Sequence, residues 1–313
     1  TYLFDLVDSY LSVWPDKETE VLFDRLLPFF DSPVSVRPRK EKYVIRKDGK
    51  VRQYGSLRHV ADTGSKWLVS AGEVLQVNLF GKLLTLLLNK YAHLDQEGIG
   101  LSYEADRPGW NDAMNGLPGL FGSGVSETIE LAKIARFLLA TGDANQDREV
   151  MMLRSGWKLC EQLGSIPKDL GELARWDARM SALENYRQQL VDPQYVETRS
   201  MAACLKTIAM ISDTLNLAVE KAGALAPILP TYLTYTATKH QPITDDSGKP
   251  VIGDYGLPTT MVQEFHLDPL PAFLEAPARL LQSGLQTEAA RTLHLAIKSS
   301  DIYDHKLKFY KTS

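Results

Sequence analysis

The chain has 313 residues, with 35 Lys and Arg against 39 Asp and Glu, a formal net charge of −4 and 44% hydrophobic residues. This composition is ordinary for a globular protein, and the length allows a core that needs neither disulfides nor a structural metal. The two cysteines, Cys160 and Cys204, cannot form a zinc cluster, and their helical surroundings predict two buried or half-buried thiols rather than a disulfide. No stretch approaches the roughly eighteen uncharged apolar residues of a membrane span.

The ends of the sequence indicate a piece of a longer chain. It begins at Thr1 without an initiator Met or a basic leader, and it stops abruptly at Ser313. Since the sequence has neither a signal segment nor a disulfide framework, we expect a cytoplasmic protein.

Apolar residues recur at spacings of three and four along most of the chain, which predicts a mostly α fold in a single domain over residues 1–313. We expect helices over residues 4–11, 21–29, 74–94, 126–142, 145–163, 171–191, 195–222, 269–283 and 287–299. Ser126 is expected to cap the fourth of these helices, with Glu127 in its positive first turn. Such paired helices suit a helical toroid better than a small bundle, and a closed ring would need more residues, so we expect an incomplete toroid.

Residues 37–58 depart from the helical pattern. They carry nine basic and two acidic residues, and the segment 42–54 alternates around Asp48 and Gly49, the pattern of a two-residue hairpin turn. We expect a basic β-hairpin that projects from the helical body. Because aromatic residues there are limited to Tyr43 and Tyr54, we expect solvated faces and no binding of nucleic acid.

Two long loops are expected as well. Residues 240–260 are rich in Pro, Gly and Asp and read as a loop between helices. Residues 103–127, here called the acid loop, are rich in glycine yet hold aromatic and acidic residues. Trp110 offers a flat apolar face for a sugar ring, Asp112 a carboxylate beside it, and Asn111 and Asn115 could bond hydroxyl groups. Alternatively, Trp110 packs into the core and Asp112 caps a turn.

Trp110, Asn111 and Asp112, in a glycine-rich loop ahead of a helix, resemble the acid loop of the cellobiose phosphorylase-like enzymes, the inverting glycoside phosphorylases of glycoside hydrolase family ninety-four. The resemblance implies an (α/α)6 catalytic barrel, of which this chain would cover a large part. It also implies that Asp112 is the general acid and that Trp110 lines the sugar subsite.

Inverting cleavage of a glycosidic bond needs an acid on the leaving oxygen and a nucleophile on the opposite face of the sugar. A hydrolase uses a second carboxylate to activate water, whereas a phosphorylase uses inorganic phosphate, which needs hydrogen-bonding or cationic residues. Glu264 could be the hydrolytic base, while Gln263 and His266 could bind phosphate. The alternatives are a surface Glu and a packing His. No His pair has metal-ligand spacing, so we expect neither a metal nor another cofactor.

The sequence thus predicts a carbohydrate-active enzyme that cleaves a β-glucoside or β-glucooligosaccharide by inverting phosphorolysis, with Asp112 as acid and phosphate as co-substrate. One alternative is an inverting glycoside hydrolase with Asp112 as acid and Glu264 as base. The other is a non-catalytic helical module for binding or assembly. The expected partners are an oligosaccharide, phosphate and either the remainder of the same polypeptide or a second copy of the chain, without nucleic acid or membrane.

Overall fold

The computed structural model describes residues 2–60, 64–107, 114–285 and 287–313. The chain is 45% helix and 23% strand, the strands lying in several small antiparallel sheets. The expectation of a mostly α toroid was therefore wrong, and the fold is mixed. Contacts divide the chain into two compact units: unit 1 holds residues 1–33, 61–93 and 130–217, and unit 2 holds residues 34–60, 94–129 and 218–313.

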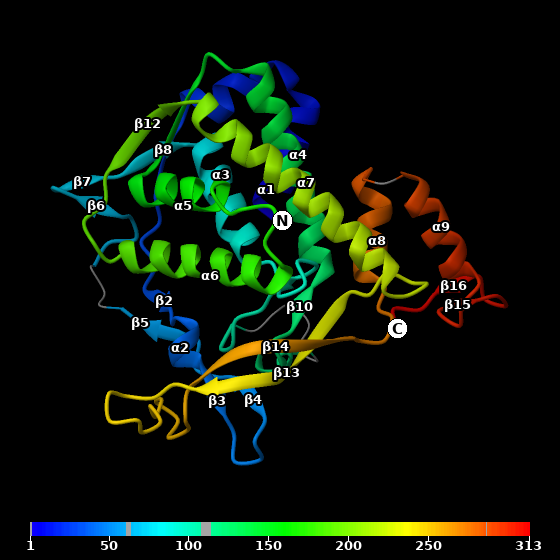
Figure 1. Cartoon of the computed structure of the whole chain (residues 1–313). Coiled ribbons are helices and arrows are strands. Elements are labelled where there is room, and N and C mark those ends of the chain that lie inside the picture. The colour runs from blue at the N-terminus through cyan, green and yellow to red at the C-terminus, as the bar shows by residue number, and fades with distance from the viewer. Residues whose placement is uncertain (1, 61–63, 108–113, 286) are drawn as a thin grey trace. The chain divides into compact units, whose positions relative to one another are not determined.

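Unit 1 is built mainly from helices, with short strands that pair two by two (Figure 1). Its elements are α1 (Tyr2–Val13), η1 (Pro15–Lys17), η2 (Glu20–Asp24), β1 (Leu26–Pro28), β6 (Val69–Ser70), β7 (Glu73–Val74), β8 (Gln76–Asn78), α3 (Leu79–Ala92), most of α4 (Val125–Ala144), β11 (Glu149–Leu153), α5 (Arg154–Gly164), α6 (Glu172–Gln189), β12 (Val196–Ser200) and most of α7 (Ala202–Ala224). Strand β1 pairs with β8, β6 with β7, and β11 with β12. Helix α3 is central to the core, because Leu83, Leu84, Leu87 and Leu88 are fully buried.

The packing of the start of α3 depends on two particular residues, Asn78 and Gly81. Asn78 accepts a hydrogen bond from the Gly81 amide at 3.0 Å as a helix cap, and it donates to the Glu149 carbonyl of β11 at 3.1 Å. A Cβ atom at Gly81 would lie 1.9 Å from the Met151 carbonyl oxygen. Glycine is therefore required at this close approach of α3 to β11.

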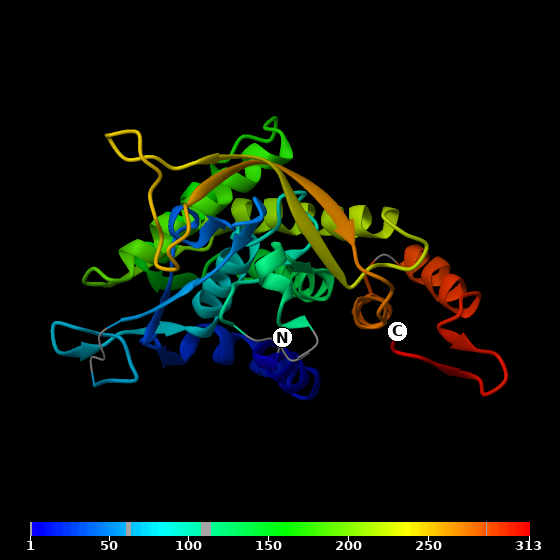
Figure 2. The same ribbon diagram turned by 90° about the horizontal axis from the view of Figure 1, so that it is seen from below.

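Unit 2 is built around an antiparallel sheet with strand order β14-β13-β10-β9. Its elements are β2 (Val34–Val36), α2 (Arg39–Lys42), β3 (Tyr43–Ile45), β4 (Val51–Gln53), β5 (Leu57–His59), β9 (Leu101–Ser102), η4 (Leu117–Leu120), β10 (Ser123–Gly124), the first turn of α4, the end of α7, β13 (Tyr232–Pro242), β14 (Thr260–Pro269), α8 (Glu275–Ser283), α9 (Thr287–Lys298), β15 (Tyr303–Asp304) and β16 (Phe309–Tyr310). Strands β13 and β14 form a long ribbon, yellow and orange in Figure 2.

Several expected helices were confirmed, and others begin later than expected. The helices over 4–11, 171–191 and 287–299 correspond to α1, α6 and α9. The segments expected as helices over 145–163 and 195–222 each open with a strand, β11 and β12, which pair with one another. The helix expected from residue 269 begins at Glu275, because β14 occupies Thr260–Pro269. Ser126 lies inside α4 and does not cap it.

The long loop expected over 240–260 was also only partly right. Strand β13 continues to Pro242 and β14 begins at Thr260, so the segment between them is the tip of a hairpin. Isolated bridges join Thr244 with Pro250 and Ile252 with Pro258, so the tip is itself folded back in two places. The Tyr and Thr residues of β13 favour a strand once a partner strand is present. That partner is β14, which lies beyond the hairpin tip in the sequence.

The hairpin around Asp48 and Gly49 was confirmed, but its turn is longer than the expected two residues, because the Arg46 amide donates to the Lys50 carbonyl at 2.9 Å and residues 47–49 lie between them. Strands β3 and β4 pair with Tyr43 opposite Gln53, and Gly49 takes a positive φ of 78°, which suits glycine. The expectation of solvated faces was wrong, because Tyr43, Val44 and Val51 are buried. Because Tyr43 and Val44 follow one another in β3, they lie on opposite faces, so both faces of the ribbon have buried residues in unit 2.

Two further features concern the thiols and helix α7. Cys160 and Cys204 are free and buried, as expected. Burial raises the pKa of Cys160 to about 11 and that of Cys204 to about 12. Helix α7, with a mean hydropathy of 1.3 over its most apolar window and 39% of that window buried, is long and apolar enough to cross a membrane by length and composition. A core helix meets the same criteria.

Candidate functional site

The central residues of the predicted acid loop, Trp110, Asn111 and Asp112, lie outside the described residues. Asn115 is described and is exposed, in a turn that leads into η4. The structure therefore defines the base of the acid loop, on both sides of residues 108–113.

The base of the loop is closed by backbone pairing and by one buried glutamine. The Tyr103 amide donates to the Gly122 carbonyl at 2.9 Å, next to the paired strands β9 and β10. The side-chain amide of Gln53 in β4 donates to the Tyr103 carbonyl at 3.0 Å and to the Pro118 carbonyl at 2.9 Å. One side chain of the β3–β4 hairpin thus holds both arms of the loop.

Aromatic packing fixes the second arm. Phe121 has a positive φ of 53°, and its ring lies edge-on to Tyr43 at 4.9 Å and to Phe265 at 5.3 Å between centroids. Such edge-to-face pairs are favourable beyond the area that they bury. The chain after residue 113 is therefore anchored between the β3–β4 hairpin and β14, all within unit 2.

A buried carboxylate organises the sheet beneath the loop. Asp95 is fully buried and accepts hydrogen bonds from the amides of Ile99 and Gly100 at 2.8 and 2.7 Å and from the Ser123 hydroxyl at 2.6 Å. Burial, and next the charge of Asp95, raise the pKa of the Tyr235 hydroxyl well above its usual value. Because its oxygens bond the β9–β10 segment internally, Asp95 has a structural role.

Two carboxylates of unit 2 are only half-buried, and each is bonded to a tyrosine hydroxyl. Tyr103 donates to Oε1 of Glu127 at 2.9 Å, and Tyr232 donates to Oε2 of Glu275 at 3.2 Å. Burial raises the pKa of Tyr103, and the charges of Glu127 and Glu275 raise it further. Gly124, whose backbone lies against Glu127 and the Tyr103 hydroxyl, pairs with Tyr232, so the four residues lie together. We call Tyr103, Glu127, Tyr232 and Glu275 the carboxylate–tyrosine cluster.

The cluster lies against the backbone at Gly124. A Cβ atom there would meet Oε2 of Glu127 at 2.0 Å and the hydroxyl of Tyr103 at 2.1 Å. The ring of Phe273 stacks on Tyr232 at 5.7 Å between centroids. Hydroxyl groups, carboxylates and flat rings are the groups that bind sugars, since they bond hydroxyls and cover apolar ring faces.

Sequence reasoning missed this cluster. It identified Glu127 only as an acid at a helix start. The four residues come from β9's end, the first turn of α4, the start of β13 and the start of α8, so no local spacing joins them.

Glu104, beside the cluster in sequence, has a different role. It forms a buried ion pair with Lys42, whose side chain is 1% exposed. A buried, paired carboxylate of this kind holds α2 against the first arm of the acid loop and is not accessible to a substrate.

The residues expected to bind phosphate or to activate water lie on β14, not at a loop end. Phe265 packs against Phe121 and Tyr235, so the alternation of a strand puts Glu264 and His266 on the opposite face. All three predicted residues, Gln263, Glu264 and His266, are exposed. Gln263 donates to Gln241 at 3.3 Å, and His266 lies 3.4 Å from Asp268.

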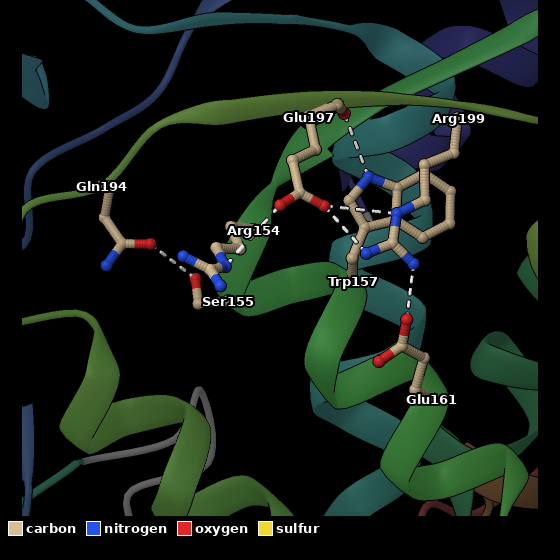
Figure 3. Close-up of polar contacts among 7 residues, drawn as sticks. All are labelled: Arg154, Ser155, Trp157, Glu161, Gln194, Glu197 and Arg199. Atoms are coloured by element: carbon tan, nitrogen blue, oxygen red, sulfur yellow. Dashed lines mark hydrogen bonds and ion pairs between the residues drawn. The ribbon is translucent and has the colours of Figure 1, made fainter.

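Unit 1 holds a separate polar network, drawn in Figure 3. The guanidinium of Arg199 bonds Glu161 at 2.5 Å and Glu197 at 2.8 Å, and it lies over the Trp157 ring at 4.9 Å from the centroid. Arg154 reaches the other oxygen of Glu197 at 3.6 Å, and the Trp157 indole donates to the Glu197 carbonyl at 3.0 Å. Trp157 is fully buried and cannot stack on a sugar. The network joins β12 to α5.

Among the residues that the structure describes, no group of three or more His, Cys, Asp or Glu is placed to hold a metal ion. Neither the protein-family models nor the curated proteins that we compared with this chain give a match.

Proposed function

We propose that this chain is part of a carbohydrate-active enzyme that cleaves a β-glucoside by inverting phosphorolysis. Asp112 protonates the leaving oxygen, and inorganic phosphate attacks the anomeric carbon from the opposite face. The sequence Trp110, Asn111, Asp112 supports this role for the acid loop. The proposal does not include a toroid, because the described fold is mixed.

The observation that carries the proposal is the carboxylate–tyrosine cluster at the base of the acid loop. Tyr103 belongs to the first arm of the loop, and Glu127 follows its second arm, so their hydrogen bond of 2.9 Å joins the two ends. Tyr103, Glu127 and Glu275 are half-buried and Tyr232 is buried, and hydroxyl and carboxylate groups are the kinds of group that bond the hydroxyls of a sugar. Tyr232 from β13 and Glu275 from α8 reach the same place. The groups proposed to bind the sugar are therefore held by regular secondary structure.

The second candidate is an inverting hydrolase. It is favoured by the presence of half-buried carboxylates in the cluster, since a hydrolase needs a base besides the acid. Glu127 is a better candidate for the base than Glu264. Glu264 is exposed, and it lies on the face of β14 opposite Phe265, whose ring packs against Phe121 in the second arm of the acid loop.

The test is to incubate the full chain with β-glucooligosaccharides, with and without phosphate, and to follow glucose 1-phosphate and free sugar. We expect glucose 1-phosphate only when phosphate is present, and none from the Asp112→Asn variant. Asp106→Asn is the matched control, because Asp106 is an exposed acid in the same loop, and it should retain activity.

Other outcomes distinguish the alternatives. Free sugar that forms without phosphate and disappears in Glu127→Gln would favour the hydrolase with Glu127 as base, and loss in Glu264→Gln alone would favour Glu264. No product from any oligosaccharide would contradict both enzymes and favour a binding or assembly module.

A further inference from the structure

A cavity of about 190 Å³ lies within unit 1, lined by α3, α5, α6, α7 and the loop that follows α5. All its lining residues belong to unit 1, whereas the carboxylate–tyrosine cluster belongs to unit 2. The cavity is therefore independent of the proposed glycosidic chemistry.

Three cationic side chains line this cavity. Arg175 and Arg179 lie one turn apart on α6, and Lys168 comes from the loop after α5. Residues four apart share one face of a helix, so both guanidinium groups reach the cavity from the same side. Arginine stays charged at any ordinary pH, and its planar fork fits the two oxygens of a carboxylate or phosphate.

Arg179 is buried, whereas the Arg175 side chain is 30% exposed and only part of its guanidinium is buried. Arg179 is only 2% exposed, and its guanidinium lies 5.8 Å from the centroid of the Tyr91 ring, which also lines the cavity. Arg175 bonds Glu172 at 3.1 Å through Nη2, while its Nε is buried without a hydrogen-bond partner in the part of the chain that the structure describes. A buried N–H donor of this kind favours an acceptor brought by a ligand.

The other walls of the cavity are mostly apolar. Leu163, Ile166 and Leu217 line it, and Leu217 is 48% exposed at the surface. Two neutral polar groups of the lining are engaged within the protein: the Tyr91 hydroxyl donates to the Met210 sulfur at 3.4 Å, and the Thr214 hydroxyl donates to the Met210 carbonyl at 2.8 Å. The chemistry offered to a ligand is therefore cationic on one side and apolar on the other.

We propose that this cavity binds a small organic anion, a carboxylate or phosphate monoester with a short apolar body. The oxyanion lies against Arg175, Arg179 and Lys168, and the body lies against Leu163 and Leu217. The volume is below the roughly 300 Å³ at which pockets for drug-sized ligands begin, so the ligand is small. Asp213, an exposed acid of the lining, opposes the anion and limits its affinity.

Titration calorimetry of the full chain with four probes tests the proposal. The probes are propyl phosphate, butyrate, inorganic phosphate without a body, and butanol without a charge. We expect propyl phosphate or butyrate to bind at least about tenfold more tightly than inorganic phosphate, and butanol not to bind. Tighter binding of one of the two organic anions would identify which oxyanion the cavity takes.

Variants of the lining provide the second part of the test. Arg175→Gln and Lys168→Gln should each weaken binding of the preferred anion, Arg175→Gln by about tenfold, since a charge-assisted hydrogen bond is lost. Asp213→Asn should strengthen it. Lys206→Gln is the matched control, because Lys206 is an exposed lysine of α7 outside the lining, and it should leave binding unchanged.

Three results would overturn the proposal. The first is that neither organic anion shows saturable binding to the unmodified chain. The second is that inorganic phosphate binds as tightly as the organic anions. The third is that the Arg175→Gln variant unfolds at the same temperature as the unmodified chain and still binds the preferred anion as tightly. Because Lys168 and Asp213 are exposed, their variants test the cavity without a risk to folding.

Discussion

The hydroxyl of Tyr103 donates a hydrogen bond to Oε1 of Glu127 at 2.9 Å, directly over the backbone of Gly124. This one bond connects the first arm of the acid loop with the first turn of α4. It also places a tyrosine in an environment where its ionised form is disfavoured, by burial and by the charge of Glu127. The relationship can be tested through stability as well as through activity.

Replacing Tyr103 by Phe should lower the free energy of unfolding at pH 8 by about 1 kcal/mol, because the hydrogen bond to Glu127 is lost. The pKa of Tyr103 is raised in the folded chain, so its contribution is fully present below the unfolded value of 10.0 and is lost as the pH rises beyond it. Urea unfolding at pH 8 and pH 11 measures both effects. The difference in the free energy of unfolding between the unmodified chain and Tyr103→Phe should be smaller at pH 11 than at pH 8. The same difference at both pH values would contradict the raised pKa of Tyr103.

Replacing Lys42 by Met should destabilise the chain by about 3–5 kcal/mol, because the buried carboxylate of Glu104 would lose the buried ammonium group that pairs with it. The double variant with Glu104→Leu should be more stable than Lys42→Met alone. Arg58→Gln serves as the control, since the exposed pair of Arg58 with Glu41 at 2.6 Å should contribute less than about 1 kcal/mol. Thermal and urea unfolding measure all three variants, and equal losses for Lys42→Met and Arg58→Gln would refute the role of the buried pair.

Gly81→Ala should destabilise unit 1, since its Cβ atom would lie 1.9 Å from a backbone oxygen of β11, which cannot move aside without breaking the β11–β12 ladder. We expect a loss of about 1–3 kcal/mol. Gly223→Ala is the matched control, because that helical glycine of α7 has no atom within 4 Å of the added carbon. The control should gain up to about 1 kcal/mol from helix propensity. Loss of stability in both variants would show that the close approach is not the cause.

The thiols of Cys160 and Cys204 should react slowly with a thiol reagent at pH 8 in the folded chain. Burial raises their pKa values to about 11 and about 12, so little thiolate forms and the reagent has little access. In urea both thiols should react at the rate of a free cysteine. Fast labelling of either thiol without urea would mean that α5 or α7 opens readily in solution.

Features that depend on nearby residues could be predicted from the sequence. The amphipathic repeats of α1, α6 and α9 indicate helices because a helical face is set by residues three and four apart. The Asp48–Gly49 turn is likewise local, since Gly49 provides the positive φ that the hairpin needs. The two buried thiols were predicted on the same basis.

Strands β13 and β14 of unit 2 could not be predicted in this way. The segment of β13 contains Tyr and Thr residues whose spacing also fits a helix, and only pairing with β14, beyond a hairpin tip of residues 243–259, decides for a strand. The same holds for β11 and β12, which pair with one another across two helices. Acid-loop residues Trp110, Asn111 and Asp112 remain a prediction.

The sequence by itself determined the helical faces of α1, α6 and α9 and the tight turn at Gly49, because each depends on contacts within a few residues. Only the tertiary structure decided that the fold is mixed and that Glu127 meets Tyr103. It also decided that Glu275 and Tyr232 share their surroundings and that Arg175 and Arg179 line one cavity with Lys168. These groups come from segments far apart in the chain, and their proximity follows from strand pairing and burial, which no local spacing records.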